Sequence, residues 1–241
     1  MKSISYKQEF FDLVSQLTPF NDKIVIEHDE SGDVTKIRRQ DDEKTSAYIL
    51  SAPREYFDIE DKVGFYKYSE FYRFLKTLNN PNIKINQNKL MLSNDASRFT
   101  YILTDASRMK TGPNDFNMED PDFKFDLDSE SLMEIVKMST LLKNSKHSEI
   151  TCVGDKINVK ICMEEGDNSF EKTFDASHSN YEFAKEPLQF KIFSDFFTKL
   201  PSRHDYTISI KAPGHLIFDM KSDDIQLKLY TALLRNRKRG K

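Results

Sequence analysis

The feature that most constrains this chain is a unit of one short helix and several strands that recurs four times. Each unit contains a serine just before or at the start of an amphipathic segment, and these serines lie 60 to 65 residues apart: Ser5, Ser69, Ser129 and Ser194. Each is predicted to be a helix N-cap, because its hydroxyl can accept a hydrogen bond from an amide of the first turn. A fixed period of this length is typical of folds built from repeated supersecondary units.

The second unit shows the pattern most clearly. Its apolar residues have the spacing of one helix face, at Phe71, Phe74, Leu75 and Leu78, and Pro81 follows the helix. Three strands are predicted after it, at Asn82–Ile85, Lys89–Leu92 and Arg98–Leu103. One helix and a small sheet are too little to close a hydrophobic core, so we expect an α+β fold with two similar domains of two units each. Elsewhere, the sequence predicts a strand at Phe65–Tyr68 and a loop at Asp175–Lys185.

The segment Thr104–Pro121 has the composition of a linker. It contains Gly112-Pro113-Asn114 and no hydrophobic period. The predicted organisation is therefore a domain at residues 1–104, a connector at 105–121, a domain at 122–234 and a basic tail at 235–241. Phe116 and Met118 are apolar residues inside the connector. They either pin it to a sheet or border a groove in which partner peptides dock.

Charge is unevenly placed along the chain. There are 36 basic and 39 acidic residues, and five of the basic ones lie in the tail, so the rest of the chain is clearly acidic. This balance argues against a general nucleic-acid-binding domain. Cations nevertheless recur on the polar faces of the predicted helices, at Lys7, Arg73, Lys76, Lys137, Lys143 and Lys199. Singly, each is an ordinary solvated side chain; together they would suit contact with DNA phosphates without sequence preference.

Motifs that carry chemistry are missing from the sequence. The five histidines are scattered without metal-ligand spacing, and no glycine-rich phosphate loop, GxSxG elbow or CxxC pair occurs. We therefore expect a binding or architectural protein rather than an enzyme, with no cofactor and no metal. No apolar run has membrane-spanning length, and Met1–Ile4 lacks the apolar core of a signal peptide, so a cytoplasmic location without membrane contact is expected.

The chain resembles the DNA polymerase sliding clamps. The segments that carry the resemblance are Phe190–Phe197, Tyr206–Ile210 and Ile225–Tyr230, which are similar to the last quarter of T4-type phage clamps and, more loosely, to proliferating-cell nuclear antigen. The resemblance implies a DNA clamp fold, with the helices on one face of the sheets. It also implies a closed ring of three identical subunits around double-stranded DNA, with the helix cations facing the duplex. A phage-encoded clamp would act in the host cell cytoplasm.

The resemblance also implies two sets of contact residues. DNA polymerase and the clamp loader would dock peptides in a hydrophobic groove, and the corresponding positions are Phe116, Met118, Pro213, Tyr230 and Ala232. Subunits would join through the edge strands Arg98–Leu103 and Ser169–Phe174, which place Phe99, Tyr101, Phe170 and Phe174 at the interface.

The basic tail departs from the family pattern. Two other interpretations remain open: a monomeric processivity factor of the same fold, and a phage structural or scaffolding protein. An enzyme is a more distant third.

Overall fold

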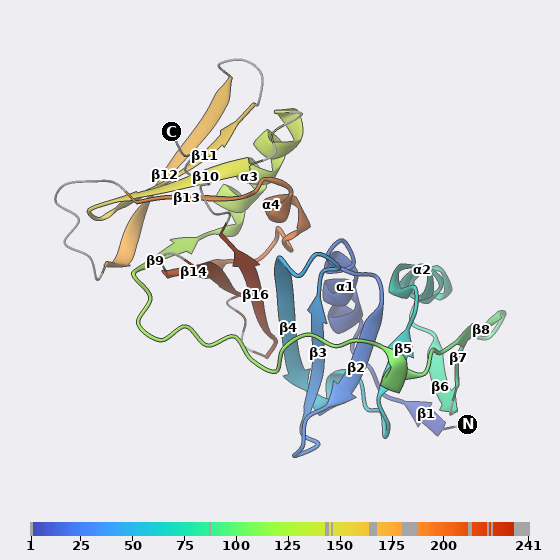
Figure 1. The fold of residues 1–241 in the computed structure, drawn as a ribbon. Helices are drawn as coiled ribbons and strands as arrows, with labels where there is room; N and C mark the ends of the chain where they lie inside the picture. Colours follow the sequence, from blue (N-terminus) through green and yellow to red (C-terminus); the bar gives the residue numbers. More distant parts are fainter. Residues whose placement is uncertain are drawn as a thin grey trace. The chain divides into compact units, whose positions relative to one another are not determined.

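The computed structural model describes residues 2–86, 88–142, 145, 147–163, 168–179, 188–211, 214–220, 222 and 224–233. The chain forms two compact units, Met1–Asp115 with Asp223–Leu227, and Phe116–Ser222 with Lys228–Lys241. The division falls inside the predicted connector at 105–121. Four modules of one helix and several strands follow one another along the chain, two in each unit (Figure 1). Among the described residues, no helix combines the length and apolar character that a membrane span requires.

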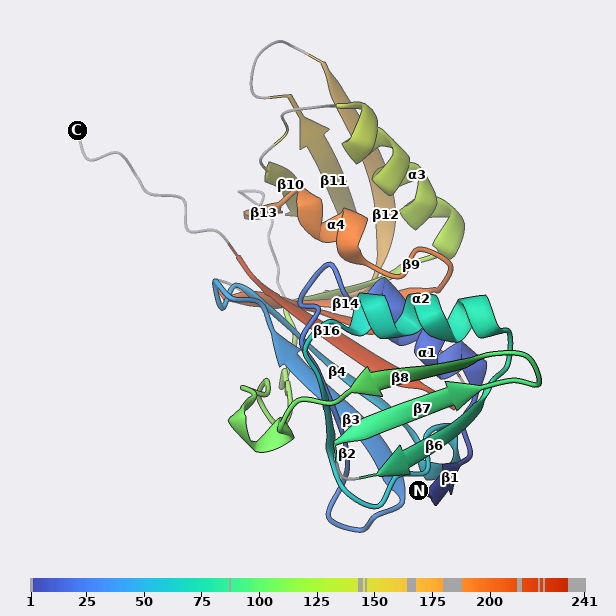
Figure 2. The same cartoon turned by 90° about the vertical axis from the view of Figure 1, so that its right-hand side faces the viewer.

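The first unit contains two helices and two antiparallel sheets. Its elements are β1 (Lys2–Ile4), α1 (Gln8–Gln16), β2 (Ile24–His28), β3 (Val34–Gln40), β4 (Ser46–Pro53), η1 (Arg54–Tyr56), β5 (Val63–Phe65), α2 (Tyr68–Leu78), β6 (Asn82–Asn86), β7 (Lys89–Ser93), β8 (Arg98–Ile102) and η2 (Ala106–Arg108). The strand orders are β1-β6-β7-β8 and β4-β3-β2-β5. Helices α1 and α2 lie side by side (Figure 2). The core between the helices and the sheets is rich in aromatic side chains, including the fully buried Phe11, Phe65 and Phe71.

The second unit repeats this arrangement. Its elements are β9 (Phe123–Leu127), α3 (Ser129–Leu141), β10 (His147–Val153), β11 (Lys156–Cys162), β12 (Ser169–Ser179), β13 (Leu188–Phe193), α4 (Asp195–Lys199), β14 (Tyr206–Lys211), β15 (His215–Met220) and β16 (Gln226–Ala232), most of which belongs to this unit. The strand order is β13-β10-β11-β12-β9-β14-β15-β16. Helix α3 packs against α4, and Phe196 of α4 contacts the buried Phe218 of β15 with 5.1 Å between ring centroids.

The predicted serine caps are largely wrong, because aspartates supply the capping oxygens. Helix α2 begins at Tyr68, and Ser69 in its first turn donates both its amide and its hydroxyl to the Asp22 carboxylate, each at 2.7 Å. Helix α3 is capped by Asp128, and Ser129 donates its amide to Asp205. Asp22 lies just before β2, which pairs with β5, the strand that leads into α2. Asp205 lies just before β14, which pairs with β9, the strand that leads into α3.

The other two serines fail as caps in different ways. Helix α1 starts after Lys7 without a side-chain cap, so Ser5 lies outside it. Ser194 occupies the N-cap position of α4, but its hydroxyl donates to the Ser145 carbonyl oxygen instead of accepting from the helix.

The Asp128 cap makes the stability of the second unit depend on pH. Its carboxylate accepts a hydrogen bond from the Ser131 amide at 2.7 Å, which lowers the pKa of Asp128. This contribution is present above the unfolded pKa of about 3.9 and disappears as the pH falls through the lower folded pKa. An Asp128→Asn variant keeps a capping acceptor without the charge. The wild type should therefore lose more free energy of unfolding than D128N between pH 7 and pH 3, measured by urea denaturation. An equal loss in both proteins would contradict the assignment.

Candidate functional site

Among the open strand edges of the described residues are those of β8 and of the first part of β12, and the strands β1, β5 and β13 also end their sheets. Strand β8 is the last strand of its sheet and pairs only with β7. In β12, the stretch Ser169–Asp175 pairs with β11 on one side, whereas β9 pairs with β12 only from Ala176 to Ser179. No described strand covers the outer edge of β8 or of Ser169–Asp175. Open edges of this kind are templates for pairing with another chain.

The hydrogen bonds beside β8 show which of its amides point outward. The Leu103 amide donates to the Asn88 carbonyl oxygen at 2.8 Å, and the Asn94 amide donates to Ser97 at 3.0 Å, on the two ends of the β7–β8 ladder. Bonded and non-bonded pairs alternate in an antiparallel ladder. Residues 99 and 101 are therefore bonded to β7, and the backbone groups of Arg98, Thr100 and Ile102 face the open edge.

The same reasoning applies to β12. The Met163 amide donates to Asn168 at 3.2 Å, and the Ala176 amide donates to Asp155 at 2.8 Å. These bonds lie on the two ends of the β11–β12 ladder, so residues 170, 172 and 174 are bonded to β11. The backbone groups of the alternate residues face outward at Ser169, Glu171, Thr173 and Asp175.

Side chains on the two edges follow the same alternation. On β8 the outward-facing residues have exposed side chains, with Ile102 65% exposed, whereas Phe99 is half-buried and Tyr101 is 8% exposed. On β12 the residues with outward amides are likewise exposed, and Phe170 and Phe174 are half-buried. The four predicted interface residues thus lie on the more buried faces of two open edges. If these two edges paired in an antiparallel manner, their exposed side chains would lie on one face of the joined sheet and their more buried side chains on the other.

Three of the predicted DNA-facing cations are already engaged with neighbours. The ammonium of Lys7 lies 4.1 Å from the centre of the Tyr56 ring. Lys76 of α2 lies 3.7 Å from the Asp12 carboxylate of α1, and Lys199 pairs with Asp195 within α4 at 2.7 Å. The two ion pairs partly offset the charges of Lys76 and Lys199, whereas the Tyr56 ring holds Lys7 in place without adding an opposite charge.

Arg73 and Lys137 are the freer cations. Both are exposed, and neither forms an ion pair with a described residue. The helix surfaces also carry exposed acids at Glu9, Glu70 and Glu130, so their charge is mixed. Lys143 lies outside the described residues.

An aromatic cluster marks the predicted peptide groove in the second unit. The rings of Phe116 and Tyr230 stack with centroids 5.4 Å apart, and His215 lies 5.5 Å from Tyr230 on its neighbouring strand. Along β16, Leu229 and Thr231 are buried, and Tyr230 and Ala232 are half-buried on the opposite face. Phe116 is 9% exposed, and burial raises the pKa of the Tyr230 hydroxyl. Met118 is half-buried, and Pro213 lies outside the described residues.

The connector is anchored beside this cluster. The Asp122 amide donates to the Ile210 carbonyl oxygen at 2.8 Å, and the buried Asp122 carboxylate lies 3.5 Å from the Lys211 ammonium. Lys211 also donates to the Asp120 carbonyl oxygen. The end of the connector is therefore held on β14. His215 was not among the groove residues predicted from the sequence. Its position at the start of the strand that precedes the C-terminal strand was the signal that could have placed it there.

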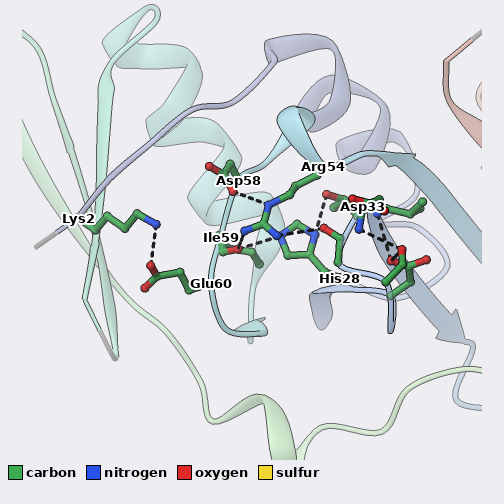
Figure 3. A network of polar contacts seen from close by, with 12 residues as sticks. Lys2, His28, Asp33, Arg54, Asp58, Ile59 and Glu60 are labelled. Atoms are coloured by element: carbon green, nitrogen blue, oxygen red, sulfur yellow. Dashed lines mark hydrogen bonds and ion pairs between the residues drawn. The ribbon is translucent and has the colours of Figure 1, made fainter.

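The polar network around His28 and Arg54 is structural (Figure 3). Arg54 donates to the Asp58 carboxylate at 2.8 Å, to the Gly32 carbonyl oxygen at 3.0 Å and to the Ile59 carbonyl oxygen at 3.3 Å. A ring nitrogen of His28 lies 2.9 Å from the same Ile59 oxygen. These bonds tie the turn between β2 and β3 to the segment after η1. Among the described residues, no group of three His, Cys, Asp or Glu side chains is placed to hold a metal.

Comparisons with known proteins identify the fold. No protein-family model and no curated protein sequence matches the chain. In structure it is similar to A. fulgidus PCNA bound to the C-terminal region of FEN-1, with a TM-score of 0.75, 12% identity, and coverage of 99% of this chain and 100% of the other. It is also similar to proliferating cellular nuclear antigen from Entamoeba histolytica, with a TM-score of 0.73, 15% identity and coverage of 97% and 99%. The PCNA2–PCNA3 complex from Sulfolobus tokodaii gives a TM-score of 0.73, 17% identity and the same coverage. The α+β clamp fold is thus confirmed.

Proposed function

We propose that this chain is a sliding clamp, which encircles duplex DNA and tethers a DNA polymerase for processive synthesis. The observation that carries the proposal is that this chain of clamp fold has open edges on β8 and on Ser169–Asp175. On both edges, exposed residues with outward-facing backbone groups alternate with more buried residues. A β8 edge of one subunit would pair with the β12 edge of the next. Such a head-to-tail interface either closes into a ring or grows into a filament. The resemblance to phage and PCNA clamps favours closure with three subunits.

Partner docking is proposed at the Phe116–Tyr230 cluster. The A. fulgidus PCNA structure carries the C-terminal region of FEN-1, so a clamp of this fold takes up a terminal segment of another protein. Here Phe116 and Tyr230 form an apolar surface on the outer side of β16. We assign this surface to terminal peptides of the polymerase and the clamp loader, and a T4-type phage clamp in the host cytoplasm is the setting that the sequence pattern favours. The role is a tether, not catalysis.

The DNA-facing assignment is tested by reversing the two freer helix cations together. An Arg73→Glu/Lys137→Glu variant should load poorly and support shorter synthesis tracts, while its oligomeric mass stays unchanged. The log–log salt slope of DNA binding should fall in magnitude by about 0.9 for each phosphate that the variant no longer neutralises. Primer-extension lengths and anisotropy titrations at several salt concentrations give both readouts.

Two controls distinguish the effect of the helix cations from the effects of other charged residues. Lys62→Glu/Lys84→Glu reverses two exposed cations away from the helices and should leave DNA activity unchanged. A chain ending at Leu234 removes the basic tail. If the truncation abolished DNA-dependent activity and the helix reversal did not, the DNA would not pass along the helices.

A further inference from the structure

We infer that the first unit carries a docking site for an acidic peptide segment, in a hollow of about 440 Å³ where the connector begins. Five cations line it, against two carboxylates: Lys23, Arg39, Lys44, Arg108 and Lys110. Arg108 pairs with Asp105 at 3.2 Å, and the other four cations still outnumber the two carboxylates of the lining, on a chain whose net charge is −3. The inference does not rest on ring formation, because every lining residue belongs to the first unit.

Arg39 forms the buried part of the hollow. Strand alternation puts its side chain on the inner face of β3, opposite Tyr48 of β4, and it is 5% exposed. One end of the guanidinium donates to the Lys110 carbonyl oxygen. Its buried Nε has no hydrogen-bond partner among the described residues. An unpaired buried donor is unfavourable, and an incoming carboxylate would supply the acceptor.

The hollow exists because β2 and β3 separate at this end. Their pairing covers Ile26–His28, and beyond it the connector borders β3 instead, with the Gly112 amide donating to the Arg38 carbonyl oxygen at 2.9 Å. A Cβ atom on Gly112 would lie 2.9 Å from three backbone atoms of Arg39, so glycine is needed for this approach. The space between the connector and the end of β2 remains open above Arg39.

The carboxylates of the hollow do not fill it. Asp41 is held in its own loop, where its oxygens accept hydrogen bonds from the Thr45 amide and hydroxyl and from the Ser46 amide, at 2.6 to 3.0 Å. Asp42 is exposed at the rim. The cations Lys23, Lys44 and Lys110 are also exposed, and they face solvent around the buried guanidinium.

A peptide fits these surroundings better than a nucleic acid. Tyr66 is 56% exposed, Lys23 lies over its ring, and Met109 adds an apolar wall, so the hollow offers room for side chains as well as charge. The planar guanidinium of Arg39 matches a carboxylate in a two-bond geometry. A continuous phosphate backbone would have to pass the Asp42 carboxylate at the rim, whereas a peptide presents its carboxylates at separate positions.

The test uses a fluorescein-labelled hexaglutamate peptide and the full chain. Anisotropy titrations should show binding that weakens at least tenfold in Lys23→Glu/Lys110→Glu, which changes two exposed side chains and leaves Arg39 in place. The Lys62→Glu/Lys84→Glu variant changes net charge equally and should bind like the wild type. Labelled hexalysine should not bind.

Several results would overturn the inference. One is equal weakening in both double variants, which would mean attraction to overall charge. Another is unchanged binding in Lys23→Glu/Lys110→Glu, which would place the peptide elsewhere, for example on the basic tail. Tighter binding of a labelled six-nucleotide thymidine oligomer at the same residues would indicate nucleic acid. Displacement of the peptide by inorganic phosphate, but not by chloride at equal ionic strength, would indicate a small-anion site.

Discussion

Replacing Thr100 with proline is expected to convert the proposed ring into monomers. The Thr100 amide faces the open edge of β8, so proline removes a donor from the proposed subunit interface without removing a bond to β7. Each interface would be weakened by about 1 kcal/mol for the bond, and a further 1–3 kcal/mol or so for the facing carbonyl left unpaired. Because every interface in a ring carries the change, closure should fail. Light scattering coupled to gel filtration measures the mass.

Two companion variants make this result specific. Thr100→Ala keeps the backbone amide and should keep the oligomer. Thr173→Pro makes the equivalent change on β12, where the Thr173 amide also faces outward, and should again give monomers. An oligomer that survives both proline variants, with circular dichroism unchanged, would mean that the subunits join elsewhere.

Replacing Tyr230 with alanine should abolish most binding of the polymerase's docking peptide. Tyr230 is the ring on which Phe116 stacks, and its removal takes away the centre of the aromatic cluster. An aromatic anchor at such a surface commonly contributes about 2 kcal/mol or more, which is roughly a thirtyfold change in Kd. The oligomeric mass should not change. Anisotropy with a labelled polymerase peptide measures the affinity.

Two further variants test whether the Tyr230 ring and its surroundings form the groove. Tyr230→Phe keeps the ring and should bind within a few-fold of the wild type. Met118→Glu introduces a charge at the half-buried connector position and should weaken binding without touching Tyr230. Normal binding by both Tyr230→Ala and Met118→Glu would place the groove elsewhere.

Local patterns predicted the modules well, because each depends on residues close in sequence. The β10–β11 hairpin turns at Gly154-Asp155, with Val153 opposite Lys156 and Gly154 at a positive φ of 57°, where glycine is favoured. The helix positions followed from their apolar faces. The exact helix starts did not, because Asp22, which caps α2, lies far from that helix in the sequence, and because Asp128 rather than the neighbouring Ser129 takes the N-cap position of α3.

Tertiary pairing overrode local composition in two places. The predicted strand at Phe65–Tyr68 ends at Phe65, since Tyr68 enters α2, and its amide donates to the Asp22 carbonyl oxygen. The predicted loop at Asp175–Lys185 is wrong for Asp175–Ser179, where β12 continues so that Ala176–Ser179 pair with β9. Residues 180–185 lie outside the described residues. Polar side chains gave no sign of this pairing, because one face of the strand is exposed.

For the candidate sites, the sequence predicted which residues take part but not the contacts that these residues make. Their interactions come from the fold: Phe116 reaches Tyr230, which lies far along the chain, only because the connector is held on β14. The ion pair between Lys76 and Asp12 joins two helices, so helix periodicity could not reveal that this cation is partly neutralised. The hollow at Arg39 was missed, because an arginine in an alternating strand gives no sign that the connector will lie beside it and accept its hydrogen bond.

Topological linkage to DNA is tested most directly by retention on circular and linear duplexes of the same sequence. The protein is loaded onto a nicked circular plasmid, separated from free protein by gel filtration, and its stoichiometry on the DNA is measured before and after a restriction cut. A clamp should stay on the circle as three subunits and slide off once the circle is cut. Retention that is equal on circular and linear DNA, with one subunit per bound molecule, would contradict a ring and indicate a monomeric processivity factor.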